Sequence, residues 1–330
     1  MRTEISTWHT SHRLRRPTLL AAVALLVSSA AAACGNGDSA PDTTPGTGRP
    51  SASSPDGTNG GTNGGTTGGT PTSPAPDETR TPSATPSGPG GEPRQVRTAV
   101  YFMQGEKISP APRTVTAPST AANALRALLA GPNGYERGHE HTTAIPSGTT
   151  LNSLAVHRKV ATVDLSGRYD DGGGSLSMRA RLAQVVFTAT RFPAIEKVQF
   201  ELDGKPVTAF GGEGVVLNKP VGRADFEDLV PLVLVESPLI GDTVRTPVRV
   251  WGSANTFEAT FRLKITDAAG RTAASVYGLA TSGSGTRGTF DMTIPYQATR
   301  SGPGTLTAWW DSPEDGHAVI EDVVHLNVKR

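Results

Sequence analysis

The sequence predicts an α+β two-layer domain followed by an all-β sandwich, with a disordered N-terminal third before both. Three observations lead to this prediction. Residues 35–95 contain no Ile, Leu, Val, Met, Phe, Tyr, Trp or Cys, so they cannot bury the apolar surface that offsets the entropy of ordering. Between residues 96 and 228 the apolar period changes back and forth between strand and helix. After residue 231 no helical period appears, and short apolar runs recur to the end.

Charge and cysteine content exclude several classes of protein. The 330 residues include 31 Lys plus Arg and 30 Asp plus Glu, a formal net charge of +1. Without a basic stripe, we expect no nucleic-acid partner. The single cysteine excludes a disulfide framework, a thiol redox pair and a cysteine-rich zinc site. We therefore expect neither a metal nor another cofactor.

The N-terminus has the features of an export signal. Four arginines precede residues 17–33, which carry no charge and end in three alanines directly before Cys34. This uncharged run is shorter than the roughly 20 residues that a membrane-spanning helix needs, and small residues are typical of a cleavage site. We expect residues 1–33 to be a signal peptide and Cys34 to be the lipidated (palmitate-bearing) first residue of a bacterial lipoprotein.

Two alternatives for this segment stay open. Ala31 stands where lipoprotein signals more often have Leu, so cleavage after Ala33 would release a secreted protein, and an uncleaved anchor would keep the signal. A twin-arginine signal is disfavoured, because Pro17 and Thr18 follow the arginine pair in place of two apolar residues.

Residues 34–95 are predicted to be a disordered tether. Gly/Asn/Thr repeats, which are flexible, are followed by Pro/Ser/Thr, which favours polyproline II. A flexible chain of about 61 residues has an end-to-end distance of roughly 40 to 45 Å. The tether would hold the folded part away from the membrane.

The first folded segment, residues 96–228, is predicted from five elements. Residues 96–103 indicate a strand. Ser119 or Thr120 can cap a helix that stops at Gly131 and Pro132. A hairpin spans residues 151–165, with its turn near Arg158.

A second helix and a final strand complete this segment. The helix follows the glycines at 172–174 and ends at Phe192 and Pro193. It has one apolar face, made by Leu182, Ala183, Val186, Phe187 and Thr190. The strand at 198–202 ends in an Asp203-Gly204 turn.

The second folded segment, residues 231–330, contains seven strand-like runs, as a β-sandwich requires. They are LVLVE, PVRVWGSA, FEATFRLKI, TAASVYGLA, GTFDMTI, TLTAWWD and IEDVVHLNV. We expect turns at 267–270, 302–304 and 315–316. The expected inward residues are Val248, Val250, Phe261, Leu263, Phe290, Leu306 and Val324.

Both segments resemble known families. The motifs AVYFM, LLAGPNGYE, TTAIPSGTTL, VATVDLS and RLAQVVFTATRFPAIEKVQFELDGKPV, with GGEG after them, follow the order seen in the GerMN domain of sporulation and spore-germination lipoproteins. The likeness covers residues 98–226 and departs at the hairpin turn, where Arg158 and Lys159 replace a glycine. The motifs VESPLIGDTVRTPVRVWGSANTFEATF and SPEDG resemble the immunoglobulin-like domain of bacterial spore-germination proteins. The resemblance implies an extracytoplasmic interaction protein with no known catalytic activity.

Few residues indicate chemistry. His139, Glu140 and His141 are the densest group of candidate metal ligands, but a catalytic zinc needs three protein ligands and the sequence shows no third one. Gly283 and its neighbours spell G-x-G-x-x-G but precede a strand, which indicates a hairpin loop. The glycines at 172–174 could hold an anion at a helix N-terminus, although a loop with a cap explains them as well.

Tryptophans are the remaining candidates. Trp251, Trp309 and Trp310 could present a sugar-stacking face. Because neighbours on a strand point in opposite directions, one of Trp309 and Trp310 can be exposed, and Trp310 is the candidate glycan-stacking residue. Core packing is the alternative for at least two of the three. Asp164 and Arg223 stand in family motifs, and a buried cap or turn role explains them as well as binding does.

We therefore expect a non-enzymatic, lipid-anchored interaction or scaffold protein on the outer face of the bacterial cell membrane. Arg outnumbers Lys 24 to 7, as in a GC-rich Gram-positive source. Because GerMN domains also occur in actinobacterial lipoproteins that work beside a sensor kinase, the resemblance implies a sensor kinase or an envelope-assembly complex as partner. The alternative functions are a module that binds cell-wall glycan (peptidoglycan) and, with least support, a hydrolase.

Overall fold

The computed structural model describes residues 94–211 and 214–330. The expected signal peptide, the lipidation site Cys34 and nearly all of the expected tether lie outside the described residues. Strand β1 (Gln95–Gln104) begins at the last residue assigned to the tether.

The first sheet has the order β2-β1-β3, and its strand β2 was not predicted. β2 (Lys107–Thr116) pairs antiparallel with β1 along its whole length, and β3 (His141–Thr142) adds a short third strand. Pro110 and Pro112 argue against a central strand. They are tolerated because β2 is an edge strand.

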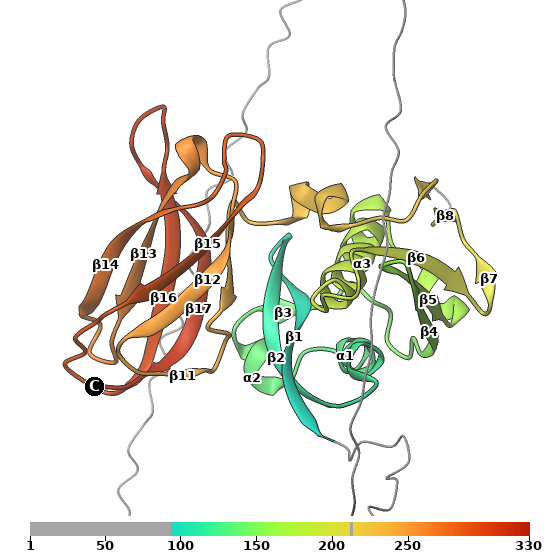
Figure 1. Ribbon diagram of the computed structural model, residues 1–330, viewed down its shortest axis with the longest axis horizontal. Helices are drawn as coiled ribbons and strands as arrows, with labels where there is room; N and C mark the ends of the chain where they lie inside the picture. The colour runs from blue at the N-terminus through green and yellow to red at the C-terminus, as the bar shows by residue number, and fades with distance from the viewer. Residues whose placement is uncertain (1–93, 212–213) are drawn as a thin grey trace, which may run out of the picture. The chain divides into compact units, whose positions relative to one another are not determined.

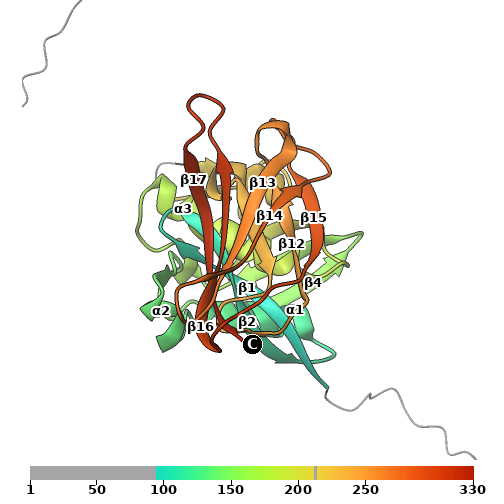
Figure 2. The ribbon, with the colours of Figure 1, turned by 90° about the vertical axis from the view of Figure 1, so that its left-hand side faces the viewer.

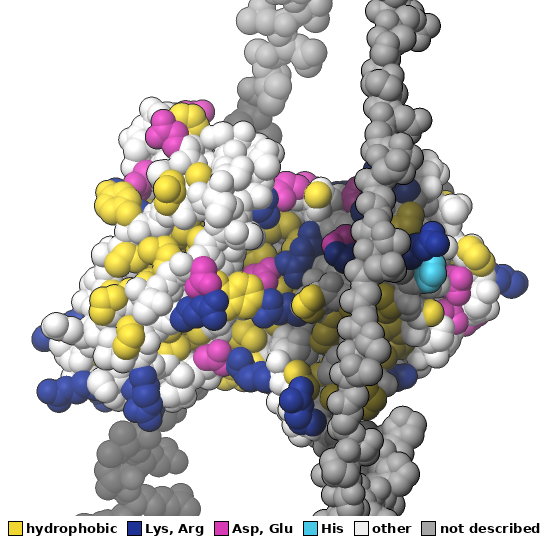
Figure 3. Space-filling model, viewed as in Figure 1, with side chains coloured by type: hydrophobic (Ala, Val, Ile, Leu, Met, Phe, Trp, Pro, Cys, Tyr) yellow, Lys and Arg dark blue, Asp and Glu magenta, His cyan; other side chains and the backbone are white. Residues whose placement is uncertain are grey.

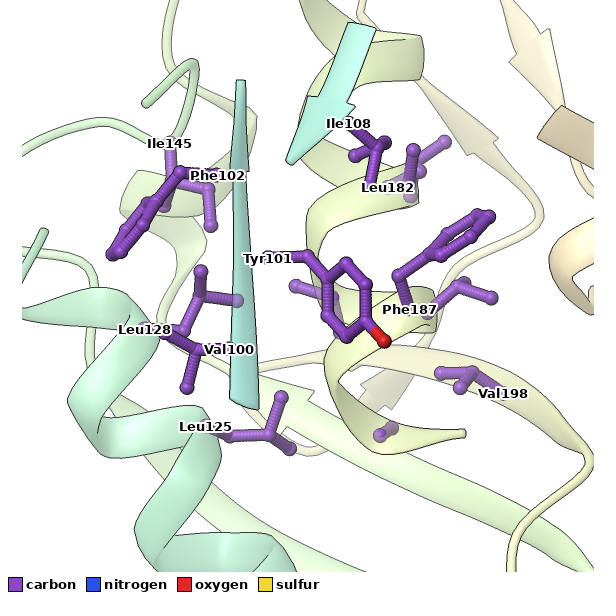
Figure 4. Packing of buried hydrophobic residues seen from close by; sticks show 14 of the residues in the cluster. Val100, Tyr101, Phe102, Ile108, Leu125, Leu128, Ile145, Leu182, Phe187 and Val198 are labelled. Atoms are coloured by element: carbon purple, nitrogen blue, oxygen red, sulfur yellow. The ribbon is translucent and has the colours of Figure 1, made fainter. Parts of the chain in front are cut away.

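β1 is buried on both faces. Val100, Tyr101 and Phe102 are all fully buried although neighbours on a strand point in opposite directions. Figure 4 shows Val100 on the side of Leu125 of α1 (Thr120–Leu129), with Tyr101 on the side of Phe187 of α3 (Ser175–Ala189). The strand therefore runs between the two helices and forms the centre of the first core.

The helices differ from the prediction in three respects. Ser119 is the N-cap residue of α1 but makes no side-chain cap hydrogen bond. The short helix α2 (Gly134–Gly138) was not predicted, although Asn133 and Glu136 form a capping box there. α3 was expected to bury one face, yet residues 180–189 are all buried. The reason is that α3 packs against β1, α1 and β6 together.

The second sheet has the order β4-β5-β6-β7. β4 (Leu151–His157) and β5 (Val160–Leu165) form the predicted hairpin. Arg158 and Lys159 adopt positive φ angles of 47° and 65° in its turn, so two non-glycine residues hold a turn that usually needs glycine. β6 (Lys197–Leu202) runs parallel to β5 after the α3 crossover, and β7 (Lys205–Pro206) follows the predicted Asp203-Gly204 turn.

Short elements lead to the second domain. They are the strands β8 (Ala209–Phe210) and β9 (Val215–Val216) and the 3₁₀ segment η2 (Arg223–Leu229). The 3₁₀ turn η1 (Gly167–Asp170) lies earlier, between β5 and α3. Of the GGEG motif, Gly211 and Gly214 are described and residues 212–213 are not.

The second domain is a sandwich of two sheets, which confirms the predicted all-β class. One sheet has the order β10-β12-β15, and the other, which faces the viewer in Figure 2, has the order β11-β17-β16-β13-β14. The strands are β10 (Val233–Ser237), β11 (Thr243–Val244), β12 (Val248–Ala254), β13 (Thr260–Thr266), β14 (Thr272–Leu279), β15 (Gly288–Ile294), β16 (Gly302–Asp311) and β17 (Ala318–Val328). All seven predicted strand runs are present, and every expected inward residue is buried.

One predicted turn in this domain is wrong. Residues 302–304 do not turn but begin β16. A Cβ on Gly304 would lie 2.2 Å from the carbonyl oxygen of Thr266, so this glycine allows a close strand approach. The turns at 267–270 and 315–316 are confirmed, and the 3₁₀ segment η3 (Phe257–Ala259) precedes β13.

Candidate functional site

A groove of about 1050 Å³ lies between the two domains, which belong to the same compact unit. One wall comes from α3 and η2, and the other comes from the outer face of β12 and β15. Charged side chains of both signs lie among apolar ones where the domains meet (Figure 3). The lining includes Phe187, Arg223, Glu227, Glu236, Arg249, Trp251, Ser253, Thr281, Arg287, Thr289 and Asp291.

Glu236 is the centre of the groove's ion-pair network. It stands at the end of β10, on the face opposite the sandwich core, and is buried. Its carboxylate accepts a hydrogen bond from Nη1 of Arg191 at 3.2 Å and another from Arg223. Both arginines belong to the first domain, so one carboxylate of the second domain joins two guanidinium groups across the junction.

Arg223 is held from several directions. Its Nε donates to Oγ1 of Thr190 at 2.9 Å and its Nη2 to the Tyr101 hydroxyl at 3.2 Å. The guanidinium lies 4.7 Å from the ring centre of Phe187. Burial, and then the charge of Glu236, raise the pKa of Tyr101. The pKa of Arg223 is also raised, because Tyr101 and Glu236 outweigh the opposing effect of burial.

Trp251 supplies the aromatic surface of the groove. It lies on β12 and is partly buried. The guanidinium of Arg191 stacks over its ring at 4.4 Å from the centre, which is a cation–π contact. One face of the indole is therefore covered by the first domain.

Arg287 fixes the connection between the domains. Its Nε lies 3.0 Å from both carboxylate oxygens of Glu227, and its Nη2 donates to the carbonyl oxygen of Pro231 at 2.8 Å. Asn255 also donates to Glu227 at 2.9 Å. The loop before β15 and the segment before β10 are thus tied together.

An exposed ion pair lies at the rim. Arg249 and Asp291 make two hydrogen bonds of 2.8 and 2.5 Å between neighbouring strands. The side-chain hydrogen bond from Arg249 lowers the pKa of Asp291. This pair remains charged across the physiological range and faces solvent.

The lining is suited to binding a polar ligand. The groove is lined by guanidinium donors, carboxylate acceptors, the hydroxyls of Ser253, Thr281 and Thr289, and one indole ring. The described residues that line it include no histidine, cysteine or lysine. The groove can therefore offer hydrogen bonds and stacking.

The structure does not bring the three candidate tryptophans together. Trp251 belongs to the three-stranded sheet, whereas Trp309 and Trp310 lie on β16 of the five-stranded sheet. Trp310 is partly buried and donates its Nε1 to Glu321 at 2.9 Å, and Trp309 has Lys264 5.8 Å from its ring centre. The glycan-stacking role of Trp310 stays a prediction.

The candidate histidines diverge. His141 lies 3.1 Å from the Ser109 hydroxyl, while the His139 ring packs 4.3 Å from that of His325 in the second domain. Burial lowers the pKa of His141 and of His325. Among residues 94–211 and 214–330, no three His, Cys, Asp or Glu side chains are grouped to hold a metal ion.

The other candidates have structural contacts. Asp164 accepts the N–H of Gly204 at 3.0 Å, which is a turn role. Gly174 is the N-cap of α3, and the nearby Gly172 carbonyl accepts a hydrogen bond from Arg181 at 2.7 Å. The G-x-G-x-x-G letters lie between β14 and β15, which belong to different sheets, so the segment is the predicted loop before a strand but not a hairpin.

Sequence reasoning missed Arg191, Glu236 and Arg287 as site residues. The only signal was the single acid that ends the apolar run LVLVE. Charged residues in isolated strands and loops do not show which partner they meet, because the partner lies in the other domain.

Two families match the chain. Residues 99–208 match the family described as sporulation and spore germination, and residues 232–317 match the immunoglobulin-like domain of bacterial spore germination. None of the curated proteins matches the sequence.

Three solved structures with similarity to the chain come from two bacteria. The first GerMN domain of the sporulation protein GerM from Bacillus subtilis is 20% identical, with a TM-score of 0.33, and the match covers 39% of this chain and 99% of that one. The tandem GerMN domains of the same protein are 14% identical, with a TM-score of 0.33 and coverage of 61% and 62%. A candidate lipoprotein from Clostridium perfringens is 20% identical, with a TM-score of 0.31 and coverage of 41% and 93%.

Within the described ranges, no helix combines the length and apolar character needed to cross a bilayer.

Proposed function

Because the chain carries a sporulation and spore germination domain followed by an immunoglobulin-like domain of bacterial spore germination, we propose that it is a lipid-anchored interaction protein on the outer face of the bacterial cell membrane. In this proposal Cys34 carries the lipid, residues 35–93 give reach, and the two folded domains bind another envelope protein. The protein acts by binding and not by catalysis.

The observation that carries the proposal is the groove built by both domains. Two arginines of the first domain converge on Glu236 of the second, and Arg287 of the second converges on Glu227 before it. These contacts fix the two walls relative to each other, and a preorganised surface loses less entropy on binding than two hinged modules would.

The chemistry of the groove indicates what it would bind. The rim pair Arg249 and Asp291 and the neighbouring hydroxyls can exchange hydrogen bonds with a polar or charged protein segment, while Trp251 offers apolar area. Tryptophan and arginine are the residue types that contribute most at protein interfaces. We infer that an envelope protein, a sensor kinase or an assembly factor, inserts a segment here.

The test has two parts. In cells, the wild-type chain should fractionate with the membrane, and Cys34→Ala should be released to the soluble fraction. Chemical crosslinking of intact cells followed by purification should recover an envelope protein from the wild type. Membrane retention of Cys34→Ala, together with recovery of no envelope protein, would contradict the proposal.

A glycan ligand is the second candidate, and the position of Trp251 favours it. Its indole lies in a groove beside the Ser253 and Thr289 hydroxyls, and aromatic rings with adjacent polar groups can bind sugars by stacking and hydrogen bonding. In co-sedimentation with purified peptidoglycan, binding that is lost in Trp251→Ala would place the glycan in the groove. Loss in Trp310→Ala would place it on β16. If the protein does not sediment with peptidoglycan, this candidate is excluded.

A further inference from the structure

Strand β4 is an open edge of the first domain. It ends the sheet β4-β5-β6-β7 and pairs with β5 alone (Figure 1). Most of its residues are exposed. Within residues 94–211 and 214–330, the backbone groups of 153–157 make no hydrogen bond except to β5. An edge of this kind is a template for another strand.

The hairpin geometry shows which groups face outward. The turn contains two residues, Arg158 and Lys159, so His157 and Val160 flank it as a hydrogen-bonded pair. Bonded and non-bonded pairs alternate along an antiparallel ladder. Ala155 therefore bonds to β5, while Leu154 and Val156 direct their N–H and C=O groups away from the sheet.

The usual protection of an edge strand is missing here. Residues 153–157 read SLAVH and include no Lys, Arg, Asp, Glu or Pro, which are the residues that normally prevent strand addition. Val156 is 46% exposed. It extends the apolar face that carries Leu154, which packs against the core.

We propose that β4 pairs antiparallel with β4 of a second copy of this chain, with Ala155 opposite Ala155 of that copy. In this register Leu154 of each copy faces Val156 of the other. The outward N–H and C=O groups of each Leu154 bond to those of the facing Val156, so four hydrogen bonds form. Each Val156 side chain then covers the neighbouring Leu154. The two four-stranded sheets become one continuous sheet, and the contact is isologous, as a two-fold axis requires.

The charges around β4 identify the second copy as the occupant. In this register the turn residue Arg158 comes beside Asn152 of the second copy, which is the bulge residue of β4. The side-chain amide of Asn152 lies 3.4 Å from Oδ1 of Asp164 and 3.5 Å from Oδ1 of Asp203. Each cationic turn therefore meets a pair of carboxylates, and the symmetry repeats this contact.

Repulsion between the two turns is weak by comparison. The two Arg158 residues would be six positions apart along the strand direction, which is about 20 Å at roughly 3.4 Å per residue. The Debye length is about 8 Å at physiological ionic strength. The interface is small, so the dimer belongs to the weak end of specific association. It leaves the groove between the domains free.

Cysteine crosslinking tests the register. Residues 35–330 contain no cysteine, so one can be introduced alone. Ala155→Cys should form a disulfide-linked dimer under mild oxidation, because facing residues of a non-hydrogen-bonded pair have Cα atoms about 4.5 Å apart. Ser153→Cys is the matched control on the same strand and face. Residue 153 of one copy lies about 13 Å from residue 153 of the other, so Ser153→Cys alone should not form a disulfide-linked dimer. Ser153→Cys mixed with His157→Cys should form one.

Sedimentation equilibrium of the cysteine-free chain tests the charge contacts. Arg158→Asp should raise the dimer dissociation constant by about tenfold or more, while Arg126→Asp, at an exposed position on α1, should leave it unchanged. Circular dichroism of Arg158→Asp and Arg126→Asp verifies that both variants fold. The crosslinking experiment does not use these two variants, so its result is independent of their folding. A chain that stays monomeric at all concentrations, equal crosslinking at 153 and 155, or capture by Ala155→Cys of a different protein in place of itself would overturn the proposal.

Discussion

The buried carboxylate of Glu236 is the most informative single change, because it joins the two domains. Glu236→Ala removes the only carboxylate that Arg191 and Arg223 share in the described structure and leaves two guanidinium groups facing one another. Breaking a buried pair by removing one partner costs about 3–5 kcal/mol. The Glu236 side chain is 7% exposed, but the arginines are 25% and 31% exposed, so water compensates part of the loss. We expect destabilisation of about 2–3 kcal/mol.

The assay is thermal denaturation of residues 35–330, monitored by tryptophan fluorescence and circular dichroism. At roughly 2–4 °C per kcal/mol for a protein of this size, the thermal midpoint should fall by about 5–10 °C. Asp291→Ala removes an exposed pair on the same groove and is the matched control, for which little change is expected. If Glu236→Ala is as stable as Asp291→Ala, the junction is not held by this network and the reasoning is wrong.

Three further predictions concern single positions. Burial raises the pKa of Asp322 to about 7, above the value of about 4 in an unfolded chain. Between pH 4 and pH 7 the folded state therefore binds one proton more than the unfolded state. The free energy of unfolding falls as the pH rises through this window. The stability of Asp322→Asn should not fall with pH in this way, so its stability relative to the wild type should rise by up to roughly 4 kcal/mol across the window. Urea midpoints measured at pH 4.5 and 7.5 that shift equally in both proteins would contradict this prediction. Gly252→Ala should be destabilised by roughly 4 kcal/mol or more, since a Cβ would lie 2.0 Å from a carbonyl oxygen of β10, whereas Gly138→Ala, with open space around it, should be near neutral in the same thermal melts. Asn133→Ala should cost about 1 kcal/mol through loss of the α2 capping box, and urea midpoints that do not move would show that the cap contributes nothing.

The sequence predicted those parts of the fold that local patterns determine. The sandwich strands follow from alternation, and their inward residues, Phe261 and Leu263 for example, follow from the period of two. The β4–β5 hairpin follows from its two apolar runs. These features depend on which side of one strand is apolar, and a single segment shows that.

The parts that were missed depend on neighbours distant in the sequence. β2 carries two prolines and is a strand only because its free edge needs no N–H at those positions. The one-sided prediction for α3 failed because β1 and β6 cover it from different sides. Glu236 could be seen as an acid in an apolar run, but its two arginines lie 45 and 13 residues before it.

The most direct test of the account is site-specific photocrosslinking in intact cells. A photoreactive residue at Thr289 would lie in the groove, whereas one at Thr293 would lie on the same strand, equally exposed and outside it. The account predicts that Thr289 captures a discrete envelope protein, that Thr293 does not, and that Cys34→Ala removes the capture. Equal capture at both positions, or capture only at Thr293, would contradict the claim that the two-domain groove is the binding site.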